Sequence, residues 1–424
     1  MRAVDIIAKK RDGYALTDAE ITWFVAAATR DEVKDYQVAA FLMAVYLRGM
    51  TRDETVSLTL AMAHSGDTFD LSDVVDYAVD KHSSGGVGDK TSLIVLPLVA
   101  SCGVTVAKMS GRGLGLSGGT LDKLDAIAGF RSDLSEADFK HNARQHGLVL
   151  AGQTRQLAPA DGQFYALRDV TATVSCLPLI VSSIMSKKIA AGANGIVLDV
   201  KAGSGAFMKT VTEAEDLARS MVEIGVSVGR DMIAVVSDMN QPLGQYVGNA
   251  LEVLEAIEIL RDGGDADLRE HCLQVAAHML RLAGQGALWN DDAAVRSELE
   301  AQLANGAAFE KLREMVSAQG GDVRMIDDPA LLPQAAIFES YTAAHDGYIA
   351  QVDAEAVAII AFELGAGREK KTDDLDLAVG ARILVKVGGA VSAGQPLMTL
   401  FANDADKLAR AQEKIAQAFA IVQS

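Results

Sequence analysis

Two glycine-rich stretches between residues 81 and 130 restrict the possible fold of this chain more than any other feature. The first reads KHSSGGVGDKTS from Lys81, and the second reads KMSGRGLGLSGGTLDKLDAIAGF from Lys108. Strand, glycine loop and helix in this order aim backbone N–H groups and a helix N-terminus at an anion. We therefore expect each stretch to join a strand to a helix, with strands at Val74–Val79 and Val104–Ala107 and helices at Ser92–Val99 and Thr120–Ile127.

The polar side chains of the two stretches suit a phosphate ligand. They supply cations and hydroxyl groups beside bare backbone: Lys81, Lys90, Lys108, Arg112, Ser83, Ser84, Ser92, Ser110, Ser117 and Thr120. Neither stretch contains the P-loop pattern or the dinucleotide fingerprint. One glycine loop often makes only a turn. Two loops with their hydroxyl groups favour a phosphate site.

Composition limits the partners of such a site. The chain has 424 residues, of which 50% are hydrophobic, so we expect two or more domains with a large core. The net charge of −18 argues against a nucleic-acid partner, because no basic field offsets phosphate charge. Three scattered cysteines lack metal spacing and indicate core thiols. No signal peptide and no apolar run of about 18 residues is visible, which predicts a cytoplasmic protein without a membrane partner.

The N-terminal residues indicate helices. TDAE at Thr17–Glu20 and TRDE at Thr51–Glu54 have the pattern of capping boxes. Between them, Val38–Leu47 is apolar almost all round, which is typical of a helix buried on two sides. The second side is covered either by the core of the same chain or by a partner subunit, and the pattern leaves both open.

The C-terminal part changes character. Residues 335–402 contain short strands with DGYIAQV and GGAVSAGQPL, which resemble the small β-domain of lipoyl and biotinyl carriers. No lysine occupies the position that such carriers modify, so we expect a structural β-rich lobe followed by a helix over Asp404–Val422. Upstream, TEAE at Thr212–Glu215 indicates the start of another helix.

The glycine-rich blocks resemble those of the thymidine phosphorylase and pyrimidine-nucleoside phosphorylase family. The resemblance continues through IIAKKRDG at Ile6–Gly13, YALRDVTATV at Tyr165–Val174, SIMSKK at Ser183–Lys188, DVKAGSGAFM at Asp199–Met208 and GNALEV at Gly248–Val253. It implies reversible phosphorolysis of a pyrimidine nucleoside, with phosphate as a substrate and no cofactor. The products would be a free base and a pentose 1-phosphate. It also implies a homodimer formed through the N-terminal helices.

The resemblance implies an α/β fold with three parts. A small helical domain would comprise residues 1–68 and 160–192. A larger α/β domain with a mainly parallel sheet would comprise residues 72–155 and 194–334, and a β-rich lobe residues 335–424. The ligand site would lie in the cleft between the two domains, at the carboxyl ends of the strands.

The resemblance also assigns the residues of the site. Phosphate would be held by Lys81, Ser83, Ser92, Ser110 and Thr120. The pyrimidine would be held by Arg168, Ser183 and Lys187, in a pocket lined by Leu114, Tyr165, Ile180 and Phe207. Ser183 and Lys187 are one helical turn apart and share a face. Taken alone, Arg168 would more simply pair with Asp161 or Asp169.

His82 follows the phosphate lysine directly. Its imidazole is therefore a candidate to protonate or hydrogen-bond the base O2 as the glycosidic bond breaks, which makes His82, Arg168 and Lys187 the predicted catalytic residues.

Ser84, Leu116 and Ser117 depart from what is common in the family, and Ser84 replaces the usual threonine but keeps the hydroxyl. Leu116 and Ser117 stand where GLGHTGGT is usual, so a loop histidine is missing. A lysine at position 108 resembles the pyrimidine-nucleoside phosphorylases with a broader substrate range. Thymidine-restricted relatives commonly carry an apolar residue at this position. An ammonium group near the pentose would bind a ribose 2′-hydroxyl, which predicts that uridine is cleaved along with thymidine and deoxyuridine.

Lys90 replaces a threonine that helps some bacterial members hold a potassium-like cation. We expect its ammonium group to pair with Glu255 and to replace that ion, so that no metal is bound.

Three alternatives remain from the sequence. One is a thymidine phosphorylase restricted to 2′-deoxynucleosides. A lower one is a phosphoribosyltransferase of related fold, such as anthranilate phosphoribosyltransferase, which would need a magnesium-binding acidic pair that is not seen beside these loops. The last is a binding protein without catalysis, which the joint presence of Lys81, His82, Arg168, Ser183 and Lys187 argues against.

Overall fold

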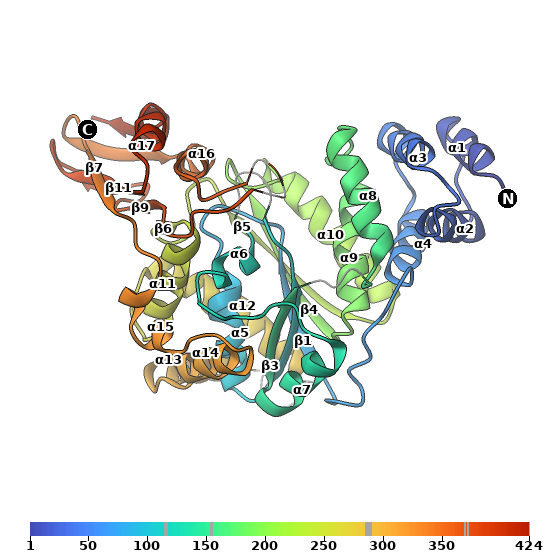
Figure 1. The fold of residues 1–424 in the computed structure, drawn as a ribbon, viewed down its shortest axis with the longest axis horizontal. Helices are drawn as coiled ribbons and strands as arrows, with labels where there is room; N and C mark the ends of the chain where they lie inside the picture. Colours follow the sequence, from blue (N-terminus) through green and yellow to red (C-terminus); the bar gives the residue numbers. More distant parts are fainter. Residues whose placement is uncertain (114–117, 153–155, 285–290, 369, 371–372, 424) are drawn as a thin grey trace.

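A five-stranded parallel sheet forms the centre of the computed structural model, which describes residues 1–113, 118–152, 156–284, 291–368, 370 and 373–423 (Figure 1). The strand order is β3-β2-β1-β4-β5. The strands are β1 Ala78–Ser83, β2 Thr105–Ser110, β3 Leu148–Gly152, β4 Gly195–Ala202 and β5 Asp231–Asp238. The predicted mainly parallel sheet is confirmed.

Helices cover both faces of this sheet. The helices α5 Thr91–Ser101 and α12 Ala266–Ala283 share a core with Val197 of β4, whereas its neighbours Ile196 and Leu198 pack with α9 Leu177–Ala190 and α10 Val211–Ser227. Successive side chains of a strand point to opposite faces, so both faces need apolar residues. The near-continuous apolar runs of the strands follow from this double burial.

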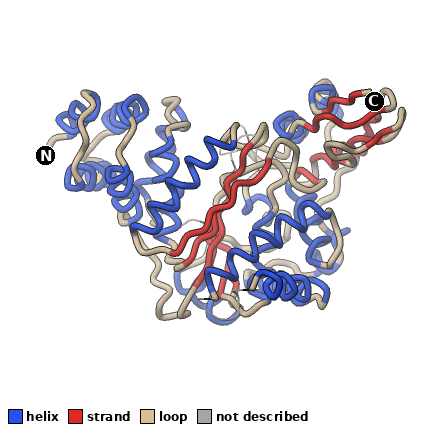
Figure 2. Tube along the Cα trace, turned by 180° about the vertical axis from the view of Figure 1, so that it is seen from behind, coloured by secondary structure: helices blue, strands red, loops and turns tan. Residues whose placement is uncertain are grey.

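The N-terminal helices form a separate small bundle at one end of the molecule (Figures 1 and 2). It contains α1 Ala3–Arg11, α2 Asp18–Thr29, α3 Asp35–Arg48, α4 Arg52–Ala63 and α8 Pro159–Val170. The rings of Phe24 and Phe41 stack in its core with centroids 4.4 Å apart. Both predicted capping boxes are present, at Thr17 and Thr51.

Helix α3 buries one face and leaves the other uncovered. Val38, Phe41 and Val45 are fully buried in the bundle. On the opposite side, Tyr46 is 41% exposed and Leu47 is 69% exposed. The apolar run predicted to be buried on two sides is therefore buried on one side within a single chain.

The C-terminal residues form an antiparallel β-rich lobe at the other end of the molecule (Figure 2). One sheet has the order β6-β9-β11-β7, and a second has the order β10-β8-β12. The segment before α11 contributes β6 Tyr246–Val247, which pairs with β9. The other strands are β7 Ile337–Thr342, β8 Gly347–Val352, β9 Gly380–Ile383, β10 Ala390–Val391, β11 Pro396–Ala402 and β12 Phe419–Val422, with α16 Ala354–Leu364 and α17 Ala405–Gln412 packed on them.

Three sequence predictions need correction. The helix predicted over Asp404–Val422 ends at Gln412, because Phe419–Val422 pairs with the free edge of β8 instead. The helix predicted to start with a box at Thr212 is capped by Thr210. The strand predicted at Val74–Val79 begins at Ala78 and runs to Ser83.

The remaining helices complete the α/β domain. They are α6 Thr120–Leu124, α7 Glu136–His146, α11 Asn249–Leu260, α13 Asp292–Ala304, α14 Ala307–Ala318 and the short α15 Arg324–Asp327. Among the described residues, no helix combines the length and the apolar character needed to cross a membrane.

Candidate functional site

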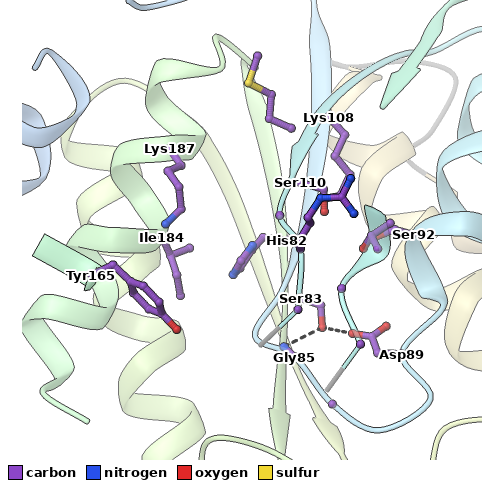
Figure 3. A pocket seen from close by; sticks show the side chains of 18 of the residues that line it. His82, Ser83, Gly85, Asp89, Ser92, Lys108, Ser110, Tyr165, Ile184 and Lys187 are labelled. Atoms are coloured by element: carbon purple, nitrogen blue, oxygen red, sulfur yellow. Dashed lines mark hydrogen bonds between the residues drawn. The ribbon is translucent and has the colours of Figure 1, made fainter. Parts of the chain in front are cut away.

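The two glycine-rich loops meet at one edge of the sheet. Strand β1 ends at Ser83, β2 ends at Ser110, and their helices α5 and α6 begin at Thr91 and Thr120. The carboxyl ends of parallel neighbours lie together, so both loops border the same space. A cavity of about 800 Å³ occupies this space and reaches across to α8 of the helical bundle and to the adjacent α9, which together are called the helical part below (Figure 3).

Four of the five predicted phosphate residues line the cavity: Ser83, Ser92, Ser110 and Thr120. The Ser83 hydroxyl donates to the Asp89 carboxylate and accepts a 3.3 Å bond from the Gly85 amide. Burial by itself would raise the pKa of Asp89, but the charges of Lys81 and Lys201 hold it well below its usual value. An ionised Asp89 thus holds the Ser83 hydroxyl at the cavity wall.

Lys81, the fifth predicted phosphate residue, does not line the cavity. Its ammonium group donates to the Thr91 hydroxyl over 2.8 Å and lies 3.9 Å from Asp89 and 3.8 Å from Asp199. It is fully buried. Lys81 and His82 are neighbours on β1, and neighbours on a strand point to opposite faces. Adjacency in the sequence therefore does not place the two side chains together.

His82 projects into the middle of the cavity (Figure 3). Burial, and then the charges of Lys188 and Lys108, hold the pKa of its imidazole well below the usual value. The ring is therefore neutral at pH 7, with one nitrogen that donates and one that accepts.

Two lysines share one buried carboxylate next to His82. Lys188 on α9 lies 2.6 Å from Asp80, and Lys108 on β2 lies 3.6 Å from the other oxygen of Asp80. Lys108 also donates to the Lys81 carbonyl and lines the cavity. Burial and the neighbouring Lys188 lower the pKa of Lys108 to about 7. Lys108 therefore changes charge near neutral pH.

The helical part supplies the opposite wall of the cavity (Figure 3). Lys187 on α9 donates to Asp161 over 2.7 Å and to the Ser183 hydroxyl over 3.0 Å. Tyr165 and Ile184 line the cavity beside it. An ammonium group has three donors, and these two contacts leave one for a ligand.

Several predicted base residues do not line the cavity. The Arg168 guanidinium donates to the carbonyls of Thr173, Val174 and Leu179, at distances from 2.6 to 3.4 Å. Ser183 and Ile180 are buried residues of α9, and Ile180 packs in the core that α9 shares with β4 and α10. Phe207 is 44% exposed on the loop after β4. Leu114, Leu116 and Ser117 lie outside the described residues.

Further residues shape the site and were not predicted, among them Asp161, Ile184, Lys188, Lys123, Asp80, Asp89 and Arg368. Ile184 could have been found, because it lies one turn after Ile180 and next to the Lys187 face. Lys123 donates to the carbonyls of Asp89 and Gly118, each over 3.0 Å, and so joins the two glycine-rich loops. No sequence pattern indicates such a contact between separate loops.

Lys90 takes the environment expected of it. Its ammonium group contacts the Glu255 carboxylate and donates to the carbonyls of Leu243 over 3.0 Å and Tyr246 over 2.7 Å. Both Lys90 and Glu255 are 1% exposed. The contact ties the first glycine-rich loop to α11. In the described part of the chain, no group of three or more His, Cys, Asp or Glu side chains is arranged to hold a metal ion.

Comparison with known proteins extends over nearly the whole chain. Residues 4–66 match the family model described as the helical bundle domain of the glycosyl transferase family. Residues 75–309 match the model described as the a/b domain of the glycosyl transferase family. The pyrimidine nucleoside phosphorylase C-terminal domain matches residues 348–422. The matches agree with the observed helical bundle and parallel sheet. Together they define the class of the protein as a two-domain glycosyl transferase with an added C-terminal lobe.

Sequence relatives narrow this class. The pyrimidine-nucleoside phosphorylase of Geobacillus stearothermophilus is 50% identical over 403 residues, covering 95% of this chain and 92% of the relative. The pyrimidine-nucleoside phosphorylase of Staphylococcus aureus is 49% identical over 406 residues, with coverage of 96% and 93%. The chain therefore belongs to the pyrimidine-nucleoside phosphorylase family.

A solved structure shows the same fold at greater distance. Anthranilate phosphoribosyltransferase from Thermus thermophilus matches with a TM-score of 0.60 and 19% identity, covering 75% of this chain and 99% of that one.

We propose that the Lys90 ammonium group replaces a monovalent cation, and we predict that turnover is the same in potassium and in tetramethylammonium salts. A Lys90→Thr variant leaves Glu255 and two carbonyls without a cation, so thermal unfolding of this variant should occur at a higher temperature in potassium than in tetramethylammonium. Wild-type protein is the matched control. A potassium requirement in the wild type would contradict the proposal.

Proposed function

We propose that this protein catalyses the reversible phosphorolysis of thymidine, deoxyuridine and uridine to a free base and a (deoxy)ribose 1-phosphate. One observation carries the proposal: hydroxyl groups at the ends of two strand–glycine–helix units face Lys187 and Tyr165 across His82, within one cavity. Family membership, with relatives named pyrimidine-nucleoside phosphorylase, supports the substrate class. Inorganic phosphate is a substrate in this scheme, and no cofactor is needed.

Phosphate would bind on the sheet side. The hydroxyls of Ser83, Ser92, Ser110 and Thr120 border the cavity there, next to the backbone at the starts of α5 and α6. Helix N-termini and hydroxyl donors together suit a phosphate dianion. Lys81 would act indirectly, through the Thr91 hydroxyl and the Asp89 carboxylate that holds Ser83.

The pyrimidine would bind on the helical side. As the glycosidic bond breaks, negative charge develops on the base, and the remaining donor of Lys187 would stabilise it. Tyr165 and Ile184 supply the apolar wall for the ring. Arg168, Ser183, Ile180 and Phe207 do not line the cavity. Their roles in base binding therefore find no support in the geometry and remain predictions.

His82 would act as a hydrogen-bond donor. Its lowered pKa keeps the imidazole neutral at pH 7, so one ring N–H is available to the base O2 without prior protonation. In the overall reaction the proton of the phosphate dianion leaves with the base, and the dianion oxygen takes the place of the base at C1′.

The proposal that ribonucleosides are also substrates depends on Lys108. It borders the cavity on the sheet side, beyond Ser110 as seen from His82 (Figure 3), and the sugar would lie next to this side of the cavity, between phosphate and base. We further propose a homodimer in the cytoplasm, in which the exposed Tyr46 and Leu47 of α3 are covered by the partner subunit.

The direct test of the proposed function is the release of free base from thymidine, deoxyuridine and uridine, measured by absorbance with and without inorganic phosphate. Phosphate-dependent release supports phosphorolysis. Release without phosphate, or none from any of the three, contradicts it.

We predict that Lys187→Ala loses turnover while phosphate still binds. Loss of one charge-assisted contact in a water-excluded site costs about 2–4 kcal/mol of transition-state stabilisation. Steady-state kinetics and calorimetry of phosphate binding measure the two effects. Lys209→Ala is the control, because Lys209 lies on the surface, 3.5 Å from Glu355. Near-normal turnover in Lys187→Ala would contradict the assignment of Lys187 to the base.

We predict that Lys108→Met loses uridine cleavage more than thymidine cleavage, by roughly tenfold, which is the scale of one hydrogen bond to a charged group. The pKa of Lys108 is about 7, so its ammonium form is lost as the pH rises. The ratio of uridine to thymidine kcat/KM should therefore fall from pH 6 to pH 8 in the wild type and stay flat in the variant. An unchanged ratio at all pH values would refute this role.

We predict a stable homodimer that Leu47→Asp dissociates, since a buried unpaired carboxylate is costly in an interface. Sedimentation at micromolar concentration measures the change. Leu331→Asp is the control, because Leu331 is 53% exposed and follows α15, outside the helical bundle. A wild-type monomer at this concentration would exclude the dimer.

A further inference from the structure

The carboxylate of Asp122 closes the neck of the second glycine-rich loop. It is 1% exposed and accepts from the amide of Gly113 over 2.6 Å and from the amide of Gly119 over 3.1 Å. These amides belong to the two ends of the loop. The ends are packed closely, since a Cβ atom on Gly119 would lie 2.2 Å from the Gly113 nitrogen. Asp122 thus fixes the spacing of the two ends.

A buried carboxylate with two amide donors still carries a full charge that needs compensation. Two guanidinium groups supply it. Arg112 lies 3.2 Å from Asp122, but its side chain is 49% exposed and also contacts Asp125. Arg368 lies 2.7 Å from Asp122 and is only 12% exposed. The better buried and closer cation for Asp122 is therefore Arg368.

Arg368 comes from the segment between α16 and β9 of the C-terminal lobe. The segment is anchored on the start of α11, where the Asn249 side chain donates to the Ala366 carbonyl over 3.0 Å and the Ala250 amide donates to the Leu377 carbonyl over 3.0 Å. Arg368 itself donates from Nε to the Asp373 carbonyl over 3.1 Å. This anchoring holds its guanidinium against Asp122, at the wall of the cavity that Arg368 also lines.

The loop that Asp122 closes presents Ser110 at one end and Thr120 at the other, and both hydroxyls border the proposed phosphate site. Displacement of binding groups by about 1 Å is enough to lose much of their effect. One ion pair, between Arg368 and Asp122, therefore joins the C-terminal lobe to the loop that carries these two hydroxyls.

We propose that Arg368 is a positioning residue for phosphate, which acts through Asp122 to hold the neck of the second glycine-rich loop. The proposal rests on the assignment of phosphate to the two glycine-rich loops above. It gives the C-terminal lobe a part in substrate binding, beyond its packing against α11.

The competing role for Arg368 is direct contact with phosphate, because it lines the cavity. A double-mutant cycle separates the two roles. If Arg368 acts through Asp122, its removal has no further effect once Asp122 has lost its charge. If Arg368 touches phosphate, the two losses multiply.

The experiment compares wild-type protein with Arg368→Ala, Arg368→Lys, Asp122→Asn and the Arg368→Ala/Asp122→Asn double variant. Arg410→Ala is the matched control, since Arg410 is an arginine of the same lobe that pairs with Glu363 at 3.3 Å, and its side chain is 54% exposed. Calorimetry with inorganic phosphate gives Kd. Kinetics gives KM for phosphate, KM for thymidine, and kcat.

We expect Arg368→Ala to weaken phosphate binding about tenfold, with KM for thymidine changed less than about twofold. Arg368→Lys should restore part of the affinity, and Arg410→Ala should match the wild type. The double variant should bind phosphate no more weakly than Asp122→Asn. Wild-type affinity in Arg368→Ala, or multiplied losses in the double variant, would overturn the proposal. If Arg368→Ala does not fold, Arg368→Lys and the same cycle built on it decide the question.

The proposed function fails separately. A wild-type protein that releases no base from any pyrimidine nucleoside would overturn phosphorolysis, whereas the calorimetric comparison of variants would still decide the role of Arg368.

Discussion

Four charged side chains compensate one another beneath the first glycine-rich loop, and the position of that loop depends on them. Lys81, Lys201 and Asp199 are fully buried, and Asp89 is nearly so. The Asp199 carboxylate lies 2.7 Å from the Lys201 ammonium group and 2.9 Å from Nε2 of His271. It also accepts a 2.7 Å hydrogen bond from the Ser237 hydroxyl. Removing one member of such a set leaves an unpaired charge, which is costly away from water. The set therefore keeps β1, β4 and the start of α5 in one arrangement.

The cavity is lined by charges of both signs, in a chain whose net charge is −18; the cavity's carboxylates are Asp89, Asp161, Asp373 and Asp374. Lys108, Lys187, Lys188 and Arg368 border it, and each is paired with an aspartate: Asp80, Asp161 or Asp122. Paired cations give little field beyond the Debye length of about 8 Å at physiological salt. An anion is thus bound by short-range hydrogen bonds at the loops rather than drawn in from a distance.

Much of the fold was predictable because its signals are local. The capping boxes at Thr17 and Thr51, the apolar strands and the glycine-rich turns each depend on neighbours in the sequence. The C-terminal residues show the limit of this reasoning. Residues 419–422 were predicted to be helical, but a free strand edge of β8 lay within reach and gave them hydrogen bonds. Only the folded chain contains that edge.

The sequence by itself determined the family, the parallel sheet, and the hydroxyl groups that border the cavity, because these follow from motifs read along the chain. The tertiary structure alone decided which cations face the ligand. Strand alternation turned Lys81 away from His82, and three backbone carbonyls took up Arg168. It also paired Lys187 with Asp161 and brought Arg368 to Asp122. Such pairs join residues distant in sequence, and burial selects them because a charge removed from water requires the nearest opposite charge.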